Sequence, residues 1–231
     1  MSGRLRRLRL AGLLAGRLAA VLAEATILAV ASSAAPAPGA DPWALLSATR
    51  DELSRLSPLA ARFTQTFVPS GFGSGDSESG ALYVDLPRCL RFEYLEPFPK
   101  NFLLCGDWVY TWNPGEPSGR RFLSGDGEAD SLDLLRLNVT ALRMRYEATA
   151  ATADGQRALI RLVPLDRDSE IRSAEIELGP VPAATGSAAR ALDALSYKDR
   201  SGNRTRFEIT AYRSLGERAV FEPPPLEWLQ D

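Results

Sequence analysis

The side chains able to carry out acid–base or nucleophilic chemistry are few. The 231 residues include no histidine, so the usual general base at neutral pH and the commonest zinc ligand are both missing. Ser-His-Asp and Cys-His mechanisms are thereby excluded. Carboxylates such as Asp85 and Glu93 remain, but in the predicted strands they lie on the solvated face beside Arg91, where ion pairing is their ordinary role. We therefore expect no enzyme, no cofactor and no metal site, with a carboxylate hydrolase as the alternative.

The two cysteines offer a different chemistry, because Cys89 and Cys105 lie on consecutive predicted strands joined by a turn around 97–100. A hairpin centred there places them within one register step of facing each other. Neighbouring strands are about 4.8 Å apart, and a disulfide needs Cα atoms within about 7 Å. We predict a bond that braces this hairpin in an oxidising compartment. In the alternative register Cys89 faces residue 108, and the two thiols stay separate.

The N-terminus predicts export into such a compartment. A basic segment with four arginines within residues 4–9 precedes a largely apolar stretch over 10–30, and small residues follow at 31–35. Arg17 and Glu24 interrupt the apolar stretch, which makes it a poor membrane anchor. We predict a cleaved signal peptide over 1–35 and a mature periplasmic protein over 36–231, with an uncleaved anchor as the alternative. The first cysteine is Cys89, so the mature chain is not itself a lipid-modified lipoprotein.

The elements that position these residues are mostly short strands. Asp41 and Pro42 are suited to cap and begin a helix over 43–56, and an apolar run predicts a second helix over 131–138. Period-two patterns separated by Gly, Pro and Asn turns predict strands at 63–67, 81–86, 89–95, 101–105, 108–112, 120–123, 142–150, 156–163, 171–178, 192–198 and 204–212. The prediction is a single, mainly β domain of about ten or eleven strands, connected as one continuous antiparallel meander.

Alternation along the strands separates an apolar face from a polar one. Leu82, Val84 and Leu86 share one side of their strand, whereas Arg91 and Glu93 lie on the polar side of the next. The two predicted helices are too short to cover so large a sheet. The sheet therefore either closes into a barrel filled by side chains or leaves a cavity for an apolar ligand.

Four blocks give the sequence a family resemblance. Phe63-Thr-Gln65, Gly80–Pro87, Leu90–Pro97 and Gly106–Pro114 follow one another with the order and spacing of the LolA family of periplasmic lipoprotein carriers. The resemblance spans about 43–225. It implies a curved, unclosed β-barrel with a short helical lid over a hydrophobic cavity. It also implies a carrier that binds the acyl chains of lipoproteins and delivers them from the inner to the outer membrane.

This resemblance, together with the alternation, gives a candidate site. The predicted lipid-binding walls are Phe63, Phe67, Leu82, Val84, Leu86, Leu90, Phe92, Tyr94, Phe102 and Leu104, and the predicted lid residues are Trp43, Leu46, Leu53, Leu132 and Leu135. One position departs from the family. The carriers have an arginine directly before the proline that ends the second strand, where it latches the lid, and this chain has Leu86 there.

The partners implied by the resemblance are acylated lipoproteins, an inner-membrane lipoprotein-releasing transporter as donor, and an outer-membrane acceptor. We expect a monomer. The net charge of −2 and the lack of a basic run predict no nucleic-acid partner. The alternative function is that of a related half-barrel shuttle or sensor for another lipid or glycolipid.

Overall fold

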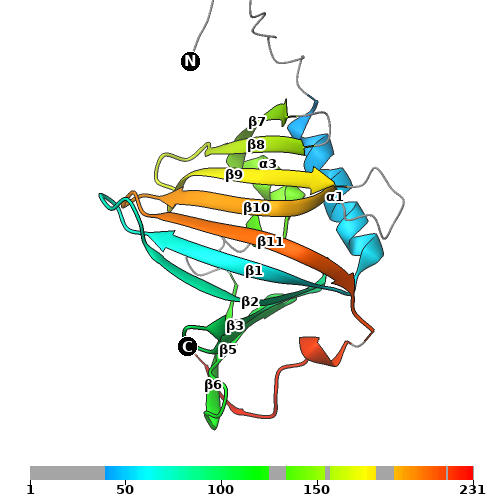
Figure 1. Cartoon of the computed structure of the whole chain (residues 1–231), viewed down its shortest axis with the longest axis vertical. Coiled ribbons are helices and arrows are strands. Elements are labelled where there is room, and N and C mark those ends of the chain that lie inside the picture. Colours follow the sequence, from blue (N-terminus) through cyan, green and yellow to red (C-terminus); the bar gives the residue numbers. More distant parts are fainter. Residues whose placement is uncertain (1–39, 125–133, 154–156, 181–189, 217, 231) are drawn as a thin grey trace, which may run out of the picture. The chain divides into compact units, whose positions relative to one another are not determined.

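The computed structural model describes residues 40–124, 134–153, 157–180, 190–216 and 218–230, all within the compact unit Pro36–Asp231. Their strands form one strongly curved sheet of twelve strands in the order β12-β6-β5-β4-β3-β2-β1-β11-β10-β9-β8-β7 (Figure 1). Among the described residues β12 and β7 do not pair with each other, so the barrel is unclosed. The predicted fold class is confirmed. None of the helices in the described ranges has the length and apolar character that a bilayer crossing requires.

The elements follow one another closely along the chain. The helical elements are α1 (Pro42–Leu56), α3 (Val139–Arg145) and the single 3₁₀ turn η2 (Ala219–Phe221). The strands are β1 (Leu59–Val68), β2 (Asp76–Asp85), β3 (Cys89–Glu96), β4 (Lys100–Cys105), β5 (Trp108–Trp112), β6 (Ser118–Leu123), β7 (Tyr146–Ala153), β8 (Arg157–Pro164), β9 (Ile171–Pro180), β10 (Arg190–Asp199), β11 (Arg204–Ser214) and β12 (Glu227–Gln230).

The connectivity differs from a continuous meander. Strands β1–β6 and β7–β11 form two separate antiparallel runs, and the two runs meet where β1 pairs with β11. After β6 the chain passes to the opposite edge of the sheet before β7 begins. Turn residues predict which strands are neighbours within a run. They hold no information about the pairing of β1 with β11, which we call the seam. The prediction of one continuous meander was therefore wrong.

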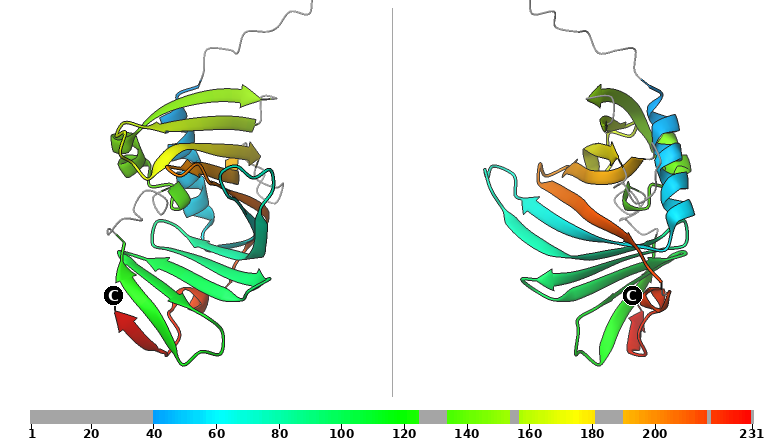
Figure 2. Two further views of the ribbon diagram at one scale, coloured as in Figure 1. Left: turned by 90° about the vertical axis from the view of Figure 1, so that its left-hand side faces the viewer. Right: turned by 45° about the vertical axis from the view of Figure 1, so that its right-hand side comes forward.

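Helix α1 forms where its capping residues predict. The Asp41 carboxylate accepts a hydrogen bond from the Trp43 backbone N–H at 3.0 Å, with Pro42 at the first helical position. The helix ends at Leu56, ahead of Pro58, because a residue before proline disfavours helical backbone. Its buried face packs chiefly against β10, β7 and α3, so α1 covers the β7–β10 half of the concave face (Figure 2).

Several element boundaries differ from prediction. Residues 142–145, predicted as strand, belong to α3, because the Asn138 side chain accepts a hydrogen bond from the Ala141 backbone N–H and caps that helix. Strand β2 begins at Asp76 instead of residue 81, because backbone pairing with β1 extends through its polar residues. The predicted helix over 131–138 is described only from residue 134, where two helical residues precede a turn. The signal peptide predicted over 1–35 lies outside the described residues.

The C-terminal segment after β11 covers part of the convex face, which the sequence predicted to be wet throughout. Strand β12, which was not predicted, pairs in parallel with β6, and the Trp228 ring lies where a side chain at Gly119 would be. Earlier in the same segment, between β11 and β12, η2 packs on β3. As a result Asn101 and Leu103, on the convex side of β4, are buried.

Candidate functional site

The centre of the concave face is a cluster of aromatic rings from four strands. Phe63 of β1 lies edge-on to Tyr94 and Phe92 of β3, with ring centroids 4.9 and 5.2 Å away. Phe92 also contacts Phe207 of β11 at 5.7 Å, and Tyr94 contacts Phe102 of β4 at 5.7 Å. Edge-to-face pairs at these separations add about 0.5–1.5 kcal/mol each beyond the burial of their area. Phe207 was not predicted, because only the seam between β1 and β11 brings it here.

The aliphatic wall residues continue the cluster across β2, β3 and β4. Val84 lies opposite Leu90, and Leu90 lies opposite Leu104. The buried members of the predicted wall share one hydrophobic core cluster, and they are Phe63, Leu82, Val84, Leu86, Leu90, Phe92, Tyr94 and Leu104, with Phe102 partly buried against it. Phe67 is apart from them near the end of β1, and 38% of its side chain surface is exposed.

The predicted lid residues lie against the same cluster as far as they are described. Leu46 and Leu53 of α1 are buried in it, whereas Trp43 and Leu135 are partly buried against it. Leu132 lies outside the described residues. The structure therefore has α1 packed on the apolar face through the side chains that the helical spacing predicts.

A band of polar groups crosses the concave face beyond the aromatic rings. The Tyr94 hydroxyl donates a hydrogen bond to the Gln65 side-chain carbonyl. The Lys100 ammonium group donates to both carboxylate oxygens of Glu78, at 2.7 and 2.8 Å, and lies 4.5 Å from the centroid of the Tyr94 ring. Burial, reinforced by the charge of Glu78, raises the pKa of the Tyr94 phenol. Tyr94 is therefore a neutral donor at physiological pH, and the apolar face ends at this band.

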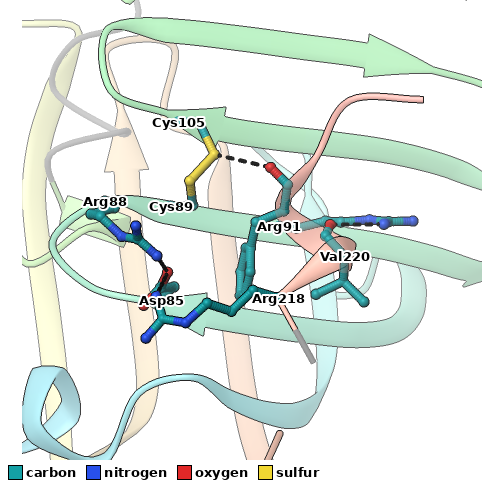
Figure 3. The surroundings of a disulfide bond; sticks show 8 residues. Asp85, Arg88, Cys89, Arg91, Cys105, Arg218 and Val220 are labelled. Carbon is teal, nitrogen blue, oxygen red and sulfur yellow. Dashed lines mark hydrogen bonds and ion pairs between the residues drawn. A yellow bond between two sulfur atoms is a disulfide. The ribbon is translucent and has the colours of Figure 1, made fainter. Parts of the chain in front are cut away.

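The carboxylates considered for hydrolysis have structural partners. Asp85 was predicted on the solvated face, but it is only 3% exposed. It pairs with Arg88 and with Arg218, which reaches it from the C-terminal segment at 2.9 Å (Figure 3). The predicted wet environment of Asp85 is therefore wrong, because the segment after β11 covers it.

Glu93 is held by its neighbours on the same face. It accepts a hydrogen bond from the Tyr83 hydroxyl at 2.8 Å, and the Arg91 guanidinium lies 3.6 Å from its other oxygen. Burial and the bond to Glu93 raise the pKa of the Tyr83 phenol. Within the described ranges no three His, Cys, Asp or Glu side chains are grouped closely enough to hold a metal ion.

The position of the family's latch arginine belongs to the apolar face here. Leu86 is buried in the hydrophobic cluster. Arg88, two residues further on, is engaged with Asp85 in the ion-pair group next to the C-terminal segment. It therefore occupies a different contact from the lid contact that the resemblance implies for residue 86.

The two cysteines lie opposite each other at the end of the β3–β4 hairpin farthest from its turn. Cys89 pairs with Cys105 in register, their Cα atoms are 4.3 Å apart, and a disulfide joins them. The Cys105 sulfur is also 3.5 Å from the backbone oxygen of Phe221 (Figure 3). Because a disulfide sulfur has no hydrogen to donate, this is a packing contact. The bond therefore joins two strands and supports the segment that crosses them.

Comparison with known proteins finds similarity at the level of structure. No protein-family model matches the chain, and no curated protein sequence matches it. A LolA superfamily protein from Nitrosomonas europaea is 11% identical, with coverage of 81% of this chain and 100% of the other and a TM-score of 0.48. A putative outer membrane lipoprotein-sorting protein domain from Vibrio parahaemolyticus is 9% identical, with coverage of 79% and 97% and a TM-score of 0.47.

A third solved structure, LprF from Mycobacterium bovis, is 13% identical, with coverage of 82% of this chain and 98% of the other and a TM-score of 0.38. The structures similar to this chain thus include LolA superfamily and lipoprotein-sorting proteins, the family that the sequence blocks resemble.

Proposed function

We propose that this protein is a periplasmic carrier that binds the acyl chains of lipoproteins against the concave face of its sheet. In this role it takes them from an inner-membrane transporter and delivers them to an outer-membrane acceptor. The observation that supports the proposal is the aromatic cluster around Phe63 and Phe92 on the inner face of an unclosed sheet. It lies on β1, β3, β4 and β11, whereas α1 packs chiefly on the β7–β10 half.

The composition of this surface suits apolar chains. Its centre consists of aromatic rings and aliphatic side chains, and the Tyr94 hydroxyl and the Glu78–Lys100 pair lie at its border. Each methylene transferred from water contributes about 0.8 kcal/mol, so shielding about ten methylenes contributes about 8 kcal/mol. A surface without buried charges binds by contact area alone, and this allows release to an acceptor with a larger apolar surface.

Loading requires a movement, because the wall residues are already buried in one cluster. We propose that α1 and the residues around Leu135 act as the lid. Their contacts with the cluster are apolar, through Leu46 and Leu53 in α1. Such contacts can be exchanged for contacts with acyl chains without breaking an ion pair.

Two adjacent leucines of β4 provide a matched test. Leu104 faces the aromatic side and Leu103 faces the C-terminal segment, and they are 2% and 0% exposed. Asparagine has the same branched arrangement of heavy atoms as leucine, so L104N keeps the shape of the side chain but presents an amide to the bound chain. An unsatisfied buried amide costs about 1–3 kcal/mol, which corresponds to a loss of affinity of roughly 5- to 150-fold. We expect L104N to weaken binding of a fluorescent fatty acid by this factor and L103N to leave the affinity unchanged, although both lower thermal stability.

The identity of the cargo is tested by native mass spectrometry of the protein recovered after export. Co-purifying lipoprotein or its acyl chains supports the proposal. A different lipid or a glycolipid would instead identify the related shuttle or sensor, the second candidate, which is favoured by Leu86 in place of the latch arginine. Equal fatty-acid affinity of L104N and the unmodified protein would contradict a site on this face.

A further inference from the structure

Exposed apolar side chains gather at one end of the sheet. This end, which we call the rim, comprises the connections at 69–75, 97–99, 113–117, 165–170 and 200–203, together with the strand ends next to them. The register of every strand pair from β12 to β7 places these connections at the same end. Nine large hydrophobic side chains among the described residues are exposed. Six of them belong to the rim, and Met144, at the end of α3, lies next to it. Single exposed hydrophobic residues are ordinary, but such a concentration marks an interaction site.

The most exposed of these side chains lie at the tips of two hairpins. Phe72 in the β1–β2 connection is 67% exposed, and Phe98 in the β3–β4 connection is 72% exposed. The β1–β2 tip is held in place, because the Ser70 backbone N–H donates to the Asn203 side chain of the β10–β11 turn at 2.9 Å. Figure 1 has these two turns side by side at the left-hand end of the sheet. Both rings are therefore exposed at hairpin tips, Phe72 between two glycines and Phe98 between two prolines.

A second group lies further along the same end. Met144 at the end of α3 and Leu165 after β8 are exposed, and the Leu165 backbone N–H donates to the Arg145 carbonyl at 2.8 Å, which brings the two segments together. Val163, near the end of β8, is also exposed. The apolar side chains thus follow the curved end of the sheet on separate elements, an arrangement that suits a broad surface better than a single groove.

We propose that the rim docks on a lipid bilayer by inserting Phe72 and Phe98 into its interface. The segments that carry these rings, residues 69–75 and 97–99, contain no charged residue, so their insertion desolvates no charge. The five connections of the rim together contain four acidic residues and two arginines. The rim therefore has no excess of cations, and docking is driven by apolar contact and not by attraction to anionic lipids.

The choice of a bilayer as the partner rests on the proposed function. An open depression at the rim has apolar and polar sides, and it is lined by Phe67, Pro97 and Phe98 together with Gln65, Asp76, Ser77 and Glu78. Gln65 accepts the hydrogen bond of Tyr94 at the border of the aromatic cluster. An acyl chain that leaves a bilayer between the hairpin tips therefore reaches the cluster along a path that begins at the rim and crosses the polar band at Gln65 and Glu78. A docked rim shortens the exposure of that chain to water.

The experiment measures flotation of the exported full chain with phosphatidylcholine vesicles. The variant F72S/F98S removes both rings, and L123S is the matched control, because Leu123 is 51% exposed but lies at the opposite end of β6. Partial burial of two phenylalanines is worth about a tenfold or larger change in partition. We expect the unmodified protein and L123S to float equally in 0.1 and 0.5 M salt, and F72S/F98S to lose at least about tenfold.

Each other result overturns the proposal. An unmodified protein that does not float, a double variant that floats as well as the control, or flotation only with anionic lipid refutes apolar docking. Association that needs a protein in the membrane identifies a protein partner in place of a lipid surface. Binding of the fluorescent fatty acid in solution separates this proposal from the proposed function: F72S/F98S should retain it, whatever the vesicles do.

Discussion

Removal of the Cys89–Cys105 disulfide should lower the stability of the protein by an amount that follows from the position of the bond. The two cysteines are 16 residues apart in the sequence. Constraining a loop of this length in the unfolded chain stabilises the folded state by about 3 kcal/mol on the chain-entropy model. For a domain of this size about 1 kcal/mol shifts the melting temperature by roughly 2–4 °C. The expected decrease is therefore about 6–12 °C.

The assay compares C89S, C105S and the double variant by calorimetry and urea unfolding. If one bond is the source, each single variant loses the whole stabilisation, and the double variant is no less stable than C105S. The chain-entropy model places the effect in the unfolded state, so the reduced protein should remain folded with the same β3–β4 register. A small extra loss is expected for C105S, because the Cys105 sulfur also packs against the Phe221 carbonyl.

The refuting results are equally specific. Two titratable thiols in the denatured, unreduced protein would exclude the bond. Losses that simply add in the double variant would show that each sulfur acts by packing alone, because independent contacts are additive and a shared covalent bond is not.

Two carboxylates give further predictions. D85N breaks the pairs that a buried carboxylate makes with Arg88 and Arg218. It should lower the free energy of unfolding in urea by about 1–2 kcal/mol, because both arginines are exposed enough to be hydrated. D168N, which alters an exposed pair, should change this free energy by less than about 0.5 kcal/mol, and equal losses would contradict the assigned role of Asp85. Burial raises the pKa of Asp193, with Arg157 acting in the opposite direction. The folded state therefore retains this proton to higher pH than the unfolded state, and stability falls as the pH rises from the ordinary Asp pKa of about 3.9 through the raised value. D193N should accordingly stabilise the protein at pH 7 and have no effect at pH 3, whereas an equal effect at both pH values would refute the assignment.

Local signals in the sequence predicted the parts of the structure that are decided locally. Asp41 and Pro42 begin α1 because a cap acts on the first helical turn. The pairing of Cys89 with Cys105 follows from the position of one turn. The alternation of Leu90, Phe92 and their neighbours places these side chains on the inner face because the side-chain period of a strand is two.

Contacts between distant segments were beyond the reach of these signals. Phe207 joins the cluster only because β11 pairs with β1, and alternation along β11 predicts its inner face but not its neighbour. Asp85 has the alternation of a solvated residue, yet Arg218 and the segment behind it exclude water from it. A period-two pattern distinguishes the two faces of a strand, but it cannot predict which face a distant segment covers.

The two ends of the sheet differ in a way that bears on how a carrier would work. At the end opposite the rim, the disulfide, the ion pairs of Asp85 and the packing of η2 on β3 join strands to the C-terminal segment. At the rim, the hairpin tips carry exposed rings and no charges on 69–75 and 97–99. Movement of strands at the cross-linked end would break a disulfide and the ion pairs of a buried carboxylate, whereas the ion pairs near the rim, Glu78–Lys100 and Asp168–Arg200, are partly or largely exposed. Lipid entry is therefore expected at the rim, while the opposite end maintains the curvature of the sheet. The cluster between the two ends then exchanges its apolar contacts with α1 for contacts with the acyl chains.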